Sequence, residues 1–244
     1  MTAETEGPLP PPVVVYRGHD LVAVSKPSGE PVVAARGEPA EACLHRRLER
    51  HLGHRLWVIH RIDRDASGLV VFAQTAAAHR AASLAFEHRE VRKTYLAFVA
   101  AGPEPESGRI GVALHAARKG KSRPARPGEP GSQQALTEYR VREGWQIDGA
   151  SVSLLEAHPL TGRHHQIRVH LRSIGAPVLF DRLYGKGLMP SFLEKAPCRR
   201  LALHSLRLEL PGGERRTVIE APLAGDLEEL RRWLDSTVPK PGRS

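Results

Sequence analysis

The sequence predicts a mixed α/β domain of the α+β kind, with many strands and only a few helices. Short apolar runs rich in β-branched residues, which are typical of buried strands, recur along the whole chain of 244 residues. Segments with helical spacing are fewer, and they do not alternate regularly with the strands as in a doubly wound fold. The chain is 41% hydrophobic, which is enough for one substantial core, and it shows no internal repeat.

The expected elements start with a hairpin, VVVY and LVAVS, that ends in the turn KPSG at residues 26–29. Further strands are predicted where apolar or alternating runs occur, at residues 56–60, 68–73, 93–100, 135–141, 150–162, 201–210 and 215–222. Helical spacing, with caps such as Thr75 and Gly53, predicts helices at residues 43–52, 75–90, 163–175 and 224–236.

The two ends of the chain differ from its middle. Residues 1–12 are proline-rich and predict a flexible N-terminal arm, because proline cannot donate the hydrogen bonds of a sheet. The folded domain is expected over residues 13–236, followed by a tail at 237–244. The sequence has neither a signal-peptide pattern nor the ~18 apolar residues of a membrane span, and its two cysteines lie far apart. We therefore expect a cytoplasmic protein that does not bind a membrane.

The charge balance favours a polyanionic partner. Lys and Arg number 36 against 27 Asp and Glu, which gives a formal net charge of +9 and a pI near 10.1. Residues 116–134 contain the basic run ARKGKSRPAR with interspersed Pro and Gly, and predict an exposed, mobile loop. This loop can grip nucleic-acid phosphates or serve solubility alone, and the sequence leaves both open.

An acid lies at a strand end in HRIDRDASGLVVFAQT, residues 60–75. A carboxylate such as Asp63, placed beside arginines in a partly desolvated cleft, can act as a nucleophile or a general base. The alternative is a charged turn in which side chains satisfy backbone amides. That alternative is favoured for Asp65 and Ser67, whereas for Asp63 both remain open on this stretch alone.

A second charged stretch, GRHHQIRVHLR, begins at Gly162. On a helix, His164 and Arg168 lie one turn apart, and so do Arg168 and Arg172, so that one face collects positive charge. Such a face can bind phosphate, pair with a buried carboxylate elsewhere, or simply be solvated.

Several other chemistries are disfavoured. The histidines of this second stretch lack HExxH spacing and a nearby acid or cysteine, so no metal site is expected. HRIDRD is similar to a kinase catalytic loop, but the Gly-rich loop and the DFG triplet are missing. Neither a GxSxG elbow nor a P-loop occurs.

Taken together, these stretches resemble the RluA-type pseudouridine synthases, which isomerise chosen uridines within structured RNA. HRIDRDASGLVVFA resembles the family motif HRLDxxTSGLLLFA, KTY resembles K-x-Y, and RHHQIRVH resembles RTHQIRVH. SKPSG, APVLFDRLYG, RLALHSLRLELP and EAPL are similar to further blocks in the family's order, so that the resemblance runs from about residue 13 to residue 223. The chain departs from the family at Ala66 and His164, where threonine is usual, and at Phe180, where glycine is usual.

The resemblance implies roles for individual residues. Asp63 would be the essential catalytic group, acting as a nucleophile or as a base toward the ribose. Tyr95 would stack on the target base and help remove its C5 proton, and Arg168 would pair with the aspartate and keep it ionised. Arg61 would occupy the space that the flipped base leaves. The residues further assigned to substrate binding are His60, Lys93, His165, Gln166 and Leu203.

The resemblance also implies the architecture and the partners. It predicts one pseudouridine synthase domain, with a curved, mostly antiparallel sheet flanked by helices and an active-site cleft across it. The substrate would be structured RNA, either ribosomal or transfer RNA. No cofactor is expected, because the isomerisation involves neither redox chemistry nor transfer to a second molecule. Only about a dozen residues precede the first strand, so we expect no S4 domain, and we expect a monomer.

Two other classes of function stay open. One is an RNA-binding or ribosome-assembly protein that has lost catalysis, which the three departures would favour and the intact acid, tyrosine and arginines disfavour. The other is a hydrolase that uses Asp63 and a histidine, for which no second acid is clearly paired.

Overall fold

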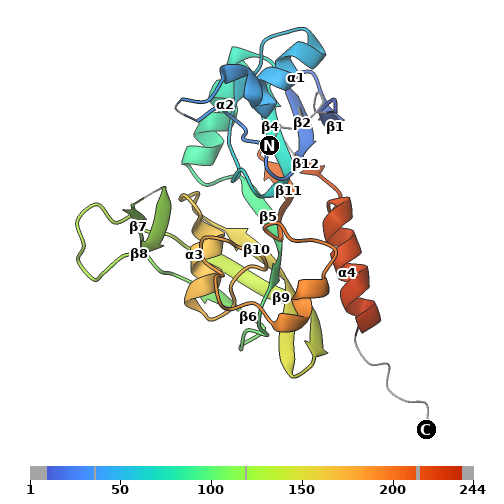
Figure 1. Ribbon diagram of the computed structural model, residues 1–244. Helices are drawn as coiled ribbons and strands as arrows, with labels where there is room; N and C mark the ends of the chain where they lie inside the picture. The colour runs from blue at the N-terminus through green and yellow to red at the C-terminus, as the bar shows by residue number, and fades with distance from the viewer. Residues whose placement is uncertain (1–9, 36, 119, 213–214, 238–244) are drawn as a thin grey trace.

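One ten-stranded sheet runs through the part of the molecule that the computed structural model describes, residues 10–35, 37–118, 120–212 and 215–237 (Figure 1). Its order is β1-β2-β4-β11-β5-β10-β9-β6, with β12 paired to β11 and β3 to β4, and only the pairing of β4 with β11 is parallel. The strands are β1 Val13–Arg17, β2 Leu21–Lys26, β3 Trp57–Val58, β4 Ser67–Ala73, β5 Arg92–Val99, β6 Ser107–Ile110, β9 Thr137–Ile147, β10 Ala150–Pro159, β11 Leu203–Leu210 and β12 Thr217–Glu220. The predicted mixed, mostly antiparallel sheet is therefore confirmed.

Helices flank this sheet. Within the described residues they are α1 Leu44–Leu52, α2 Ala76–Glu87, α3 Gln166–Ser173 and α4 Gly225–Thr237, with short 3₁₀ turns at Ala40–Ala42 and Ser191–Lys195. Two predicted caps are confirmed: the Thr75 hydroxyl accepts a hydrogen bond from the Ala78 N–H, and Gly53 ends α1 at φ 77°. No helix in the described part of the chain is both long enough and apolar enough to cross a membrane.

The predicted arm, residues 1–12, and the predicted tail, residues 237–244, lie largely outside the described residues.

The parallel seam between β4 and β11 decides where the motifs meet. Ser205 of β11 pairs with Gly68 of β4 on one side and with Tyr95 of β5 on the other. Gly68 has φ 109°, and a Cβ atom at this position would lie 2.3 Å from the Ser205 carbonyl oxygen. Only glycine permits this approach of the two strands. Asp63 lies in the segment just before β4. The seam thus brings Asp63 beside Tyr95.

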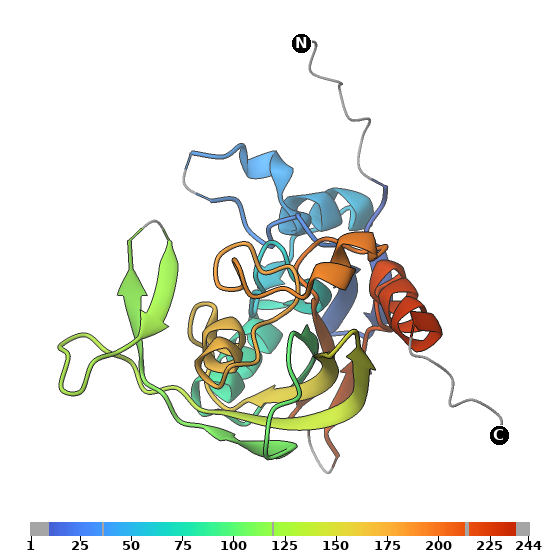
Figure 2. The same ribbon diagram turned by 60° about the horizontal axis from the view of Figure 1, so that its bottom comes forward.

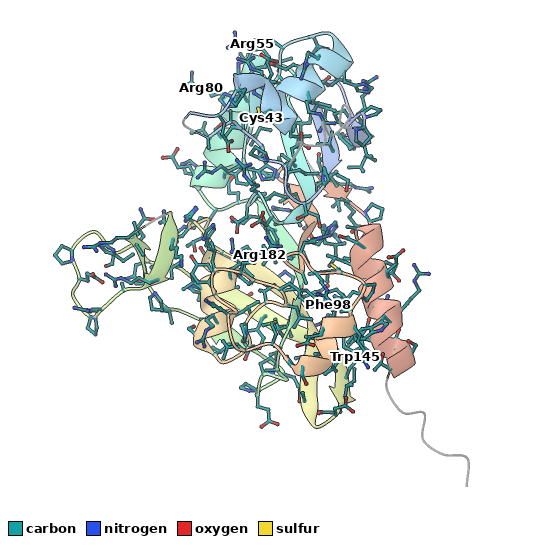
Figure 3. The ribbon with its side chains drawn as sticks, viewed as in Figure 1. Cys43, Arg55, Arg80, Phe98, Trp145 and Arg182 are labelled. Atoms are coloured by element: carbon teal, nitrogen blue, oxygen red, sulfur yellow. The ribbon has the colours of Figure 1, made fainter. Side chains whose placement is uncertain are left out.

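The main hydrophobic core supports the strands beyond the seam. Phe98 of β5 stacks on Trp145 of β9 with ring centroids 6.1 Å apart, and both are labelled in Figure 3. The indole N–H of Trp145 donates to Asp235 of α4 at 2.8 Å. Leu227, Leu230 and Leu234, which share one face of α4, are fully buried. This packing holds α4 along the β9 side of the sheet (Figure 1).

The prediction of a mobile loop over residues 116–134 is wrong in part. This segment contains β8, Lys121–Pro124, which pairs with β7, Leu114–Ala117, in a hairpin separate from the large sheet. The hairpin projects from the rest of the molecule in both views (Figures 1 and 2). The prolines of this segment argued against a strand, because proline has no N–H to donate. Pro124 is tolerated here because it faces Leu114, and the N–H and C=O of Leu114 bond to Gln133 and not to Pro124.

Two further boundaries differ from the prediction. The helix expected to begin at Arg163 begins at Gln166, because His165 has a left-handed backbone at φ 54°. His164 therefore does not lie on the helix one turn from Arg168. The strand expected over residues 56–60 stops at Val58, because the His60 side chain, through Nε2, accepts the Val71 N–H that a longer strand would have bonded.

Candidate active site

All nine residues that the sequence assigned to the site line one cavity of about 280 Å³. They are Asp63, Tyr95, Arg168, Arg61, His60, Lys93, His165, Gln166 and Leu203. They come from the chain before β4, from β5, from the start of α3 and from the start of β11. Segments more than a hundred residues apart in the sequence thus form one concave surface next to the β4–β11 seam.

Asp63 and Arg168 are paired in this cavity. Arg168 Nη1 donates to Asp63 Oδ2 at 3.0 Å. The Arg168 side chain is 3% exposed and that of Asp63 is 21% exposed, so the carboxylate is the member of the pair that a ligand can reach. Arg168 is therefore paired with a carboxylate and does not belong to a solvated basic face.

A second carboxylate, which the sequence analysis did not single out, holds the same arginine. Asp181 is fully buried and accepts from both Nε and Nη2 of Arg168 at 2.8 Å. Its Oδ1 also accepts from the backbone N–H groups of Leu183 and Tyr184. Although burial opposes the charged form, the bonds and charge of Asp181, and then Asp63, raise the pKa of Arg168 above its ordinary value.

The loop that carries Asp181 keeps an unusual backbone. Phe180 has φ 58°, the left-handed region that favours glycine, the residue usual at this place in the resembling family. The phenylalanine thus keeps a backbone conformation that a glycine would also adopt. Arg182, which follows Asp181, lies near the middle of the molecule in Figure 3.

Tyr95 forms a half-buried wall of the cavity. Burial, and to a lesser degree the negative charge of Asp63, raise the pKa of Tyr95 to about 12. The phenol therefore keeps its proton at neutral pH.

His60 and Lys93 line the neighbouring wall. The His60 ring stacks on Phe86 at 5.1 Å, and burial, with the Lys93 charge, lowers its pKa to about 3, so the imidazole is neutral. Lys93 Nζ donates to the Thr161 carbonyl at 3.1 Å. Burial, with the Arg89 charge, lowers the pKa of Lys93 to about 8.

Gln166 holds together the segments that form one wall of the cavity. Its Nε2 donates to the Leu136 carbonyl and the Thr137 hydroxyl oxygen, at 3.0 and 2.9 Å. Its Oε1 accepts from the Thr161 hydroxyl and the Arg163 N–H, at 2.6 and 3.0 Å. All four hydrogen-bonding positions of the amide are thus used within the protein.

His165 lies between Asp63 and a tyrosine. Its Nε2 is 3.9 Å from Asp63 Oδ2, and its Nδ1 is 2.8 Å from the Tyr184 hydroxyl. Burial lowers the pKa of His165 to about 4, although the Asp63 charge acts in the opposite direction. The ring is therefore neutral at pH 7.

Arg61 is exposed and borders both the main cavity and a neighbouring one of about 370 Å³. Arg64, Arg163 and His164 also line this second cavity. In the described part of the chain, no group of three or more His, Cys, Asp or Glu side chains is arranged to hold a metal ion.

The sequence analysis missed three residues at this site: Asp181, Tyr184 and Thr161. Asp181 and Tyr184 belong to the quoted block APVLFDRLYG, so the signal was present. It was not recognised, because an acid and a tyrosine in a short loop are also ordinary surface residues. Thr161 carried no such signal.

Comparison with known proteins agrees with this geometry. The RNA pseudouridylate synthase family profile matches residues 20–173. The chain is 35% identical over 198 residues to the dual-specificity RNA pseudouridine synthase RluA of Salmonella typhimurium, covering 81% of this chain and 86% of the relative. It is 31% identical over 218 residues to the ribosomal large subunit pseudouridine synthase C of Vibrio cholerae, covering 88% of this chain and 67% of the relative.

Solved structures agree as well. The human RNA pseudouridylate synthase domain containing 4 superposes with a TM-score of 0.73 and 25% identity, over 91% of this chain and 93% of the human chain. The human RNA pseudouridylate synthase domain containing 1 gives a TM-score of 0.70 and 25% identity, over 94% and 97% of the two chains. The chain therefore belongs to the RNA pseudouridylate synthase family, as an RluA-type member, and is an isomerase that acts on RNA.

Proposed function

We propose that this enzyme converts specific uridines of structured ribosomal or transfer RNA to pseudouridine, with Asp63 as the essential catalytic group and with the target base flipped into the cavity. The single observation that carries the proposal is the pairing of a reachable Asp63 carboxylate with a buried, permanently charged Arg168 inside that cavity. The choice of RNA class is supported by the two bacterial relatives, one described as acting on the large ribosomal subunit and one as dual-specific.

In this reaction the N1–C1′ bond of uridine breaks and a C5–C1′ bond forms. C5 loses a proton and N1 gains one, so the composition of the nucleotide is unchanged and no cofactor is required. Asp63 serves as the nucleophile at the ribose or as the base that removes a ribose proton. The Arg168 cation donates a hydrogen bond to this carboxylate and so holds it in place in the cavity.

The positions of Tyr95 and Arg61 support the roles proposed for them. Tyr95 presents an aromatic wall on which a uracil can stack. A phenol with a pKa of about 12 is a poor base at neutral pH, which favours stacking over C5 proton removal as its main task. Arg61 is exposed at the cavity rim, where it can enter the space vacated by the base.

The positive surface supports RNA binding. The chain has a formal net charge of +9, and Arg61, Arg64 and Arg163 lie together around the second cavity. Arginines at such a rim contact phosphates and offset the cost of unstacking the target base, which is a few kcal/mol. A cytoplasmic location and a monomeric state stay predictions.

The test is tritium release from RNA labelled at uridine C5 and isolated from cells that lack this gene. The wild type is compared with Asp63→Asn and with Asp65→Asn, a matched control, because Asp65 is an exposed carboxylate two residues away in the same loop. We expect release by the wild type and by Asp65→Asn, and none by Asp63→Asn, whose RNA affinity stays within about threefold. Release by Asp63→Asn would remove Asp63 from its role.

Failure of all three proteins on both RNA classes, despite salt-sensitive RNA binding, would favour the RNA-binding alternative. Separate assays with unmodified ribosomal RNA and with unmodified transfer RNA decide the substrate class.

A further inference from the structure

The β7–β8 hairpin touches the active site through Ser122. The Ser122 backbone N–H donates to the Tyr184 hydroxyl oxygen at 2.8 Å. Its side-chain hydroxyl lies 3.1 Å from His164 Nδ1. The Tyr184 hydroxyl lies in turn 2.8 Å from His165 Nδ1. The projecting hairpin is therefore connected to His165 of the site through two successive hydrogen bonds, by way of the Tyr184 hydroxyl.

The geometry of the hairpin leaves this N–H free to point outward. Ser122 faces Ala116 across the hairpin. Ala125 donates to the Ala113 carbonyl, and bonded pairs alternate with non-bonded pairs in an antiparallel ladder. Ser122 therefore occupies a non-bonded position, and its N–H points away from β7 toward Tyr184.

Tyr184 is held on several sides. Its backbone N–H donates to Asp181, the same carboxylate that fixes Arg168. The Arg168 guanidinium lies 5.1 Å from the centre of its ring, and the His165 ring meets it edge-on at 5.6 Å. These contacts fix the position of the Tyr184 hydroxyl.

The hydrogen bonds favour one arrangement of the protons among Ser122, Tyr184 and His165. The Tyr184 oxygen accepts a hydrogen bond from the Ser122 N–H, which leaves its own O–H free to donate a hydrogen bond to His165 Nδ1. A neutral imidazole that accepts at Nδ1 carries its proton on Nε2. His165 Nε2 faces the Asp63 carboxylate, which can only accept. With the proton on Nε2, this tautomer would direct an N–H at Asp63.

We propose that Tyr184 is a positioning residue, anchored by Ser122 of the hairpin, that fixes His165 in the tautomer whose Nε2–H points at the catalytic Asp63. This proposal rests on the function proposed above and names a residue for the same reaction. The distance of 3.9 Å between His165 Nε2 and Asp63 Oδ2 is longer than a hydrogen bond. Catalytic hydrogen bonds are often long before substrate binds and tighten afterwards. His165 would then be a second donor to Asp63 beside Arg168.

The first test is the state of the His165 ring. Protein labelled with ¹⁵N-histidine is compared, by two-bond ¹H–¹⁵N correlation NMR at pH 7.5, as wild type and as Tyr184→Phe. The His165 signals are identified by their loss in His165→Gln. We expect the wild type to carry its proton on Nε2 and Tyr184→Phe to shift toward the Nδ1–H tautomer or a mixture of both. This measurement needs no RNA, so it decides the tautomer independently of the proposed function.

The second test is the rate of one turnover. Tyr184→Phe keeps the ring that Arg168 contacts and removes only the hydroxyl. We expect its single-turnover rate to fall between about tenfold and about a hundredfold, the range for a group displaced from its reacting partner, with RNA affinity within about threefold. The matched control is Tyr139→Phe, which also removes one hydrogen-bonded hydroxyl, to the Pro105 carbonyl, away from the cavity. Ser122→Ala keeps the N–H that anchors Tyr184, so its rate should fall less than that of Tyr184→Phe.

Unchanged His165 ring signals in Tyr184→Phe would overturn the proposal, whatever the enzyme does with RNA. A single-turnover rate equal to that of Tyr139→Phe would also overturn it. A lower rate that comes entirely from weaker RNA binding would assign Tyr184 to substrate affinity and contradict the positioning role.

Discussion

The buried Asp181 carboxylate holds the Arg168 guanidinium in a two-bond fork, with both N–O distances at 2.8 Å. A fork of this kind fixes the plane of the guanidinium as well as its position. Nη1, which stands outside the fork, is consequently directed at Asp63, 3.0 Å away. The orientation of the arginine that bonds Asp63 is thus set by the buried Asp181.

Removing Asp181 should destabilise the fold and release Arg168 from its orientation toward Asp63. Asp181→Ala leaves a 3% exposed Arg168 without its main partner, and we expect a loss of about 3–5 kcal/mol in the free energy of unfolding. Urea denaturation measures it. The matched control is Asp226→Ala, which removes the equivalent fork with Arg200 at a partly exposed position and should cost about 1 kcal/mol. Equal losses in the two variants would contradict the importance of the buried fork.

Tyr95→Phe should bind RNA like the wild type and turn over more slowly, because the stacking ring stays and the hydroxyl goes. Since the pKa of Tyr95 is about 12, the phenol does not titrate between pH 6 and 9. The variant should therefore have the same shape of pH–rate profile as the wild type at a lower level. Single-turnover rates across this range check both points. Full activity would show that the hydroxyl has no role and leave Tyr95 only its aromatic ring as a contribution, and a changed profile would show that the phenol ionises during the reaction.

Lys26→Met should loosen the loop that leads into the site. Lys26 Nζ donates to the carbonyls of Pro27, Glu30 and Arg64 at 2.7–2.8 Å, and only an ammonium group can donate all three bonds. Burial disfavours the charged form and lowers the pKa of Lys26 to about 7. The three carbonyls offset part of this cost by accepting hydrogen bonds from the ammonium group. Losing the donor should destabilise the protein by at least about 3 kcal/mol in urea denaturation. Lys186→Met, at an exposed lysine, should change stability by less than about 0.5 kcal/mol. Similar values for both would refute the anchoring role.

Stability should decline in mild acid because of His204. This fully buried ring lies 3.0 Å from the Ser67 hydroxyl and 3.2 Å from the Ala221 carbonyl, and burial lowers its pKa to about 4. In an unfolded chain the pKa is about 6.5. Between these pH values the unfolded state binds more protons, so stability is fully present above about pH 6.5 and is lost as the pH falls toward 4.

The difference in pKa corresponds to about 3 kcal/mol at most for this one group. The free energy of unfolding, measured by urea at pH 7 and at pH 4.5, should therefore fall less in His204→Gln than in the wild type. An identical decline in both proteins would place the acid sensitivity elsewhere, for example at His60.

Much of the secondary structure could be predicted because it depends on local pattern. The apolar stripe of α4, the Thr75 cap of α2 and Gly53 at the end of α1 follow from helical spacing and capping chemistry. The hairpin β7–β8 could not be predicted in the same way. Its strands are short, polar and proline-containing, and they are held by contacts with residues far along the chain, such as Tyr184.

For the site, the sequence by itself determined the chemical groups: an acid, a tyrosine and two arginines stand in family-like motifs, and the structure brings all nine predicted residues into one cavity. Only the tertiary structure decided how these groups are paired. The close approach of β4 and β11 at Gly68 sets Asp63 beside Tyr95, and Asp181 directs Arg168 at Asp63. The physical reason is that spacing along the chain reports which residues are buried, whereas the partner of a buried charge depends on packing between segments distant in sequence.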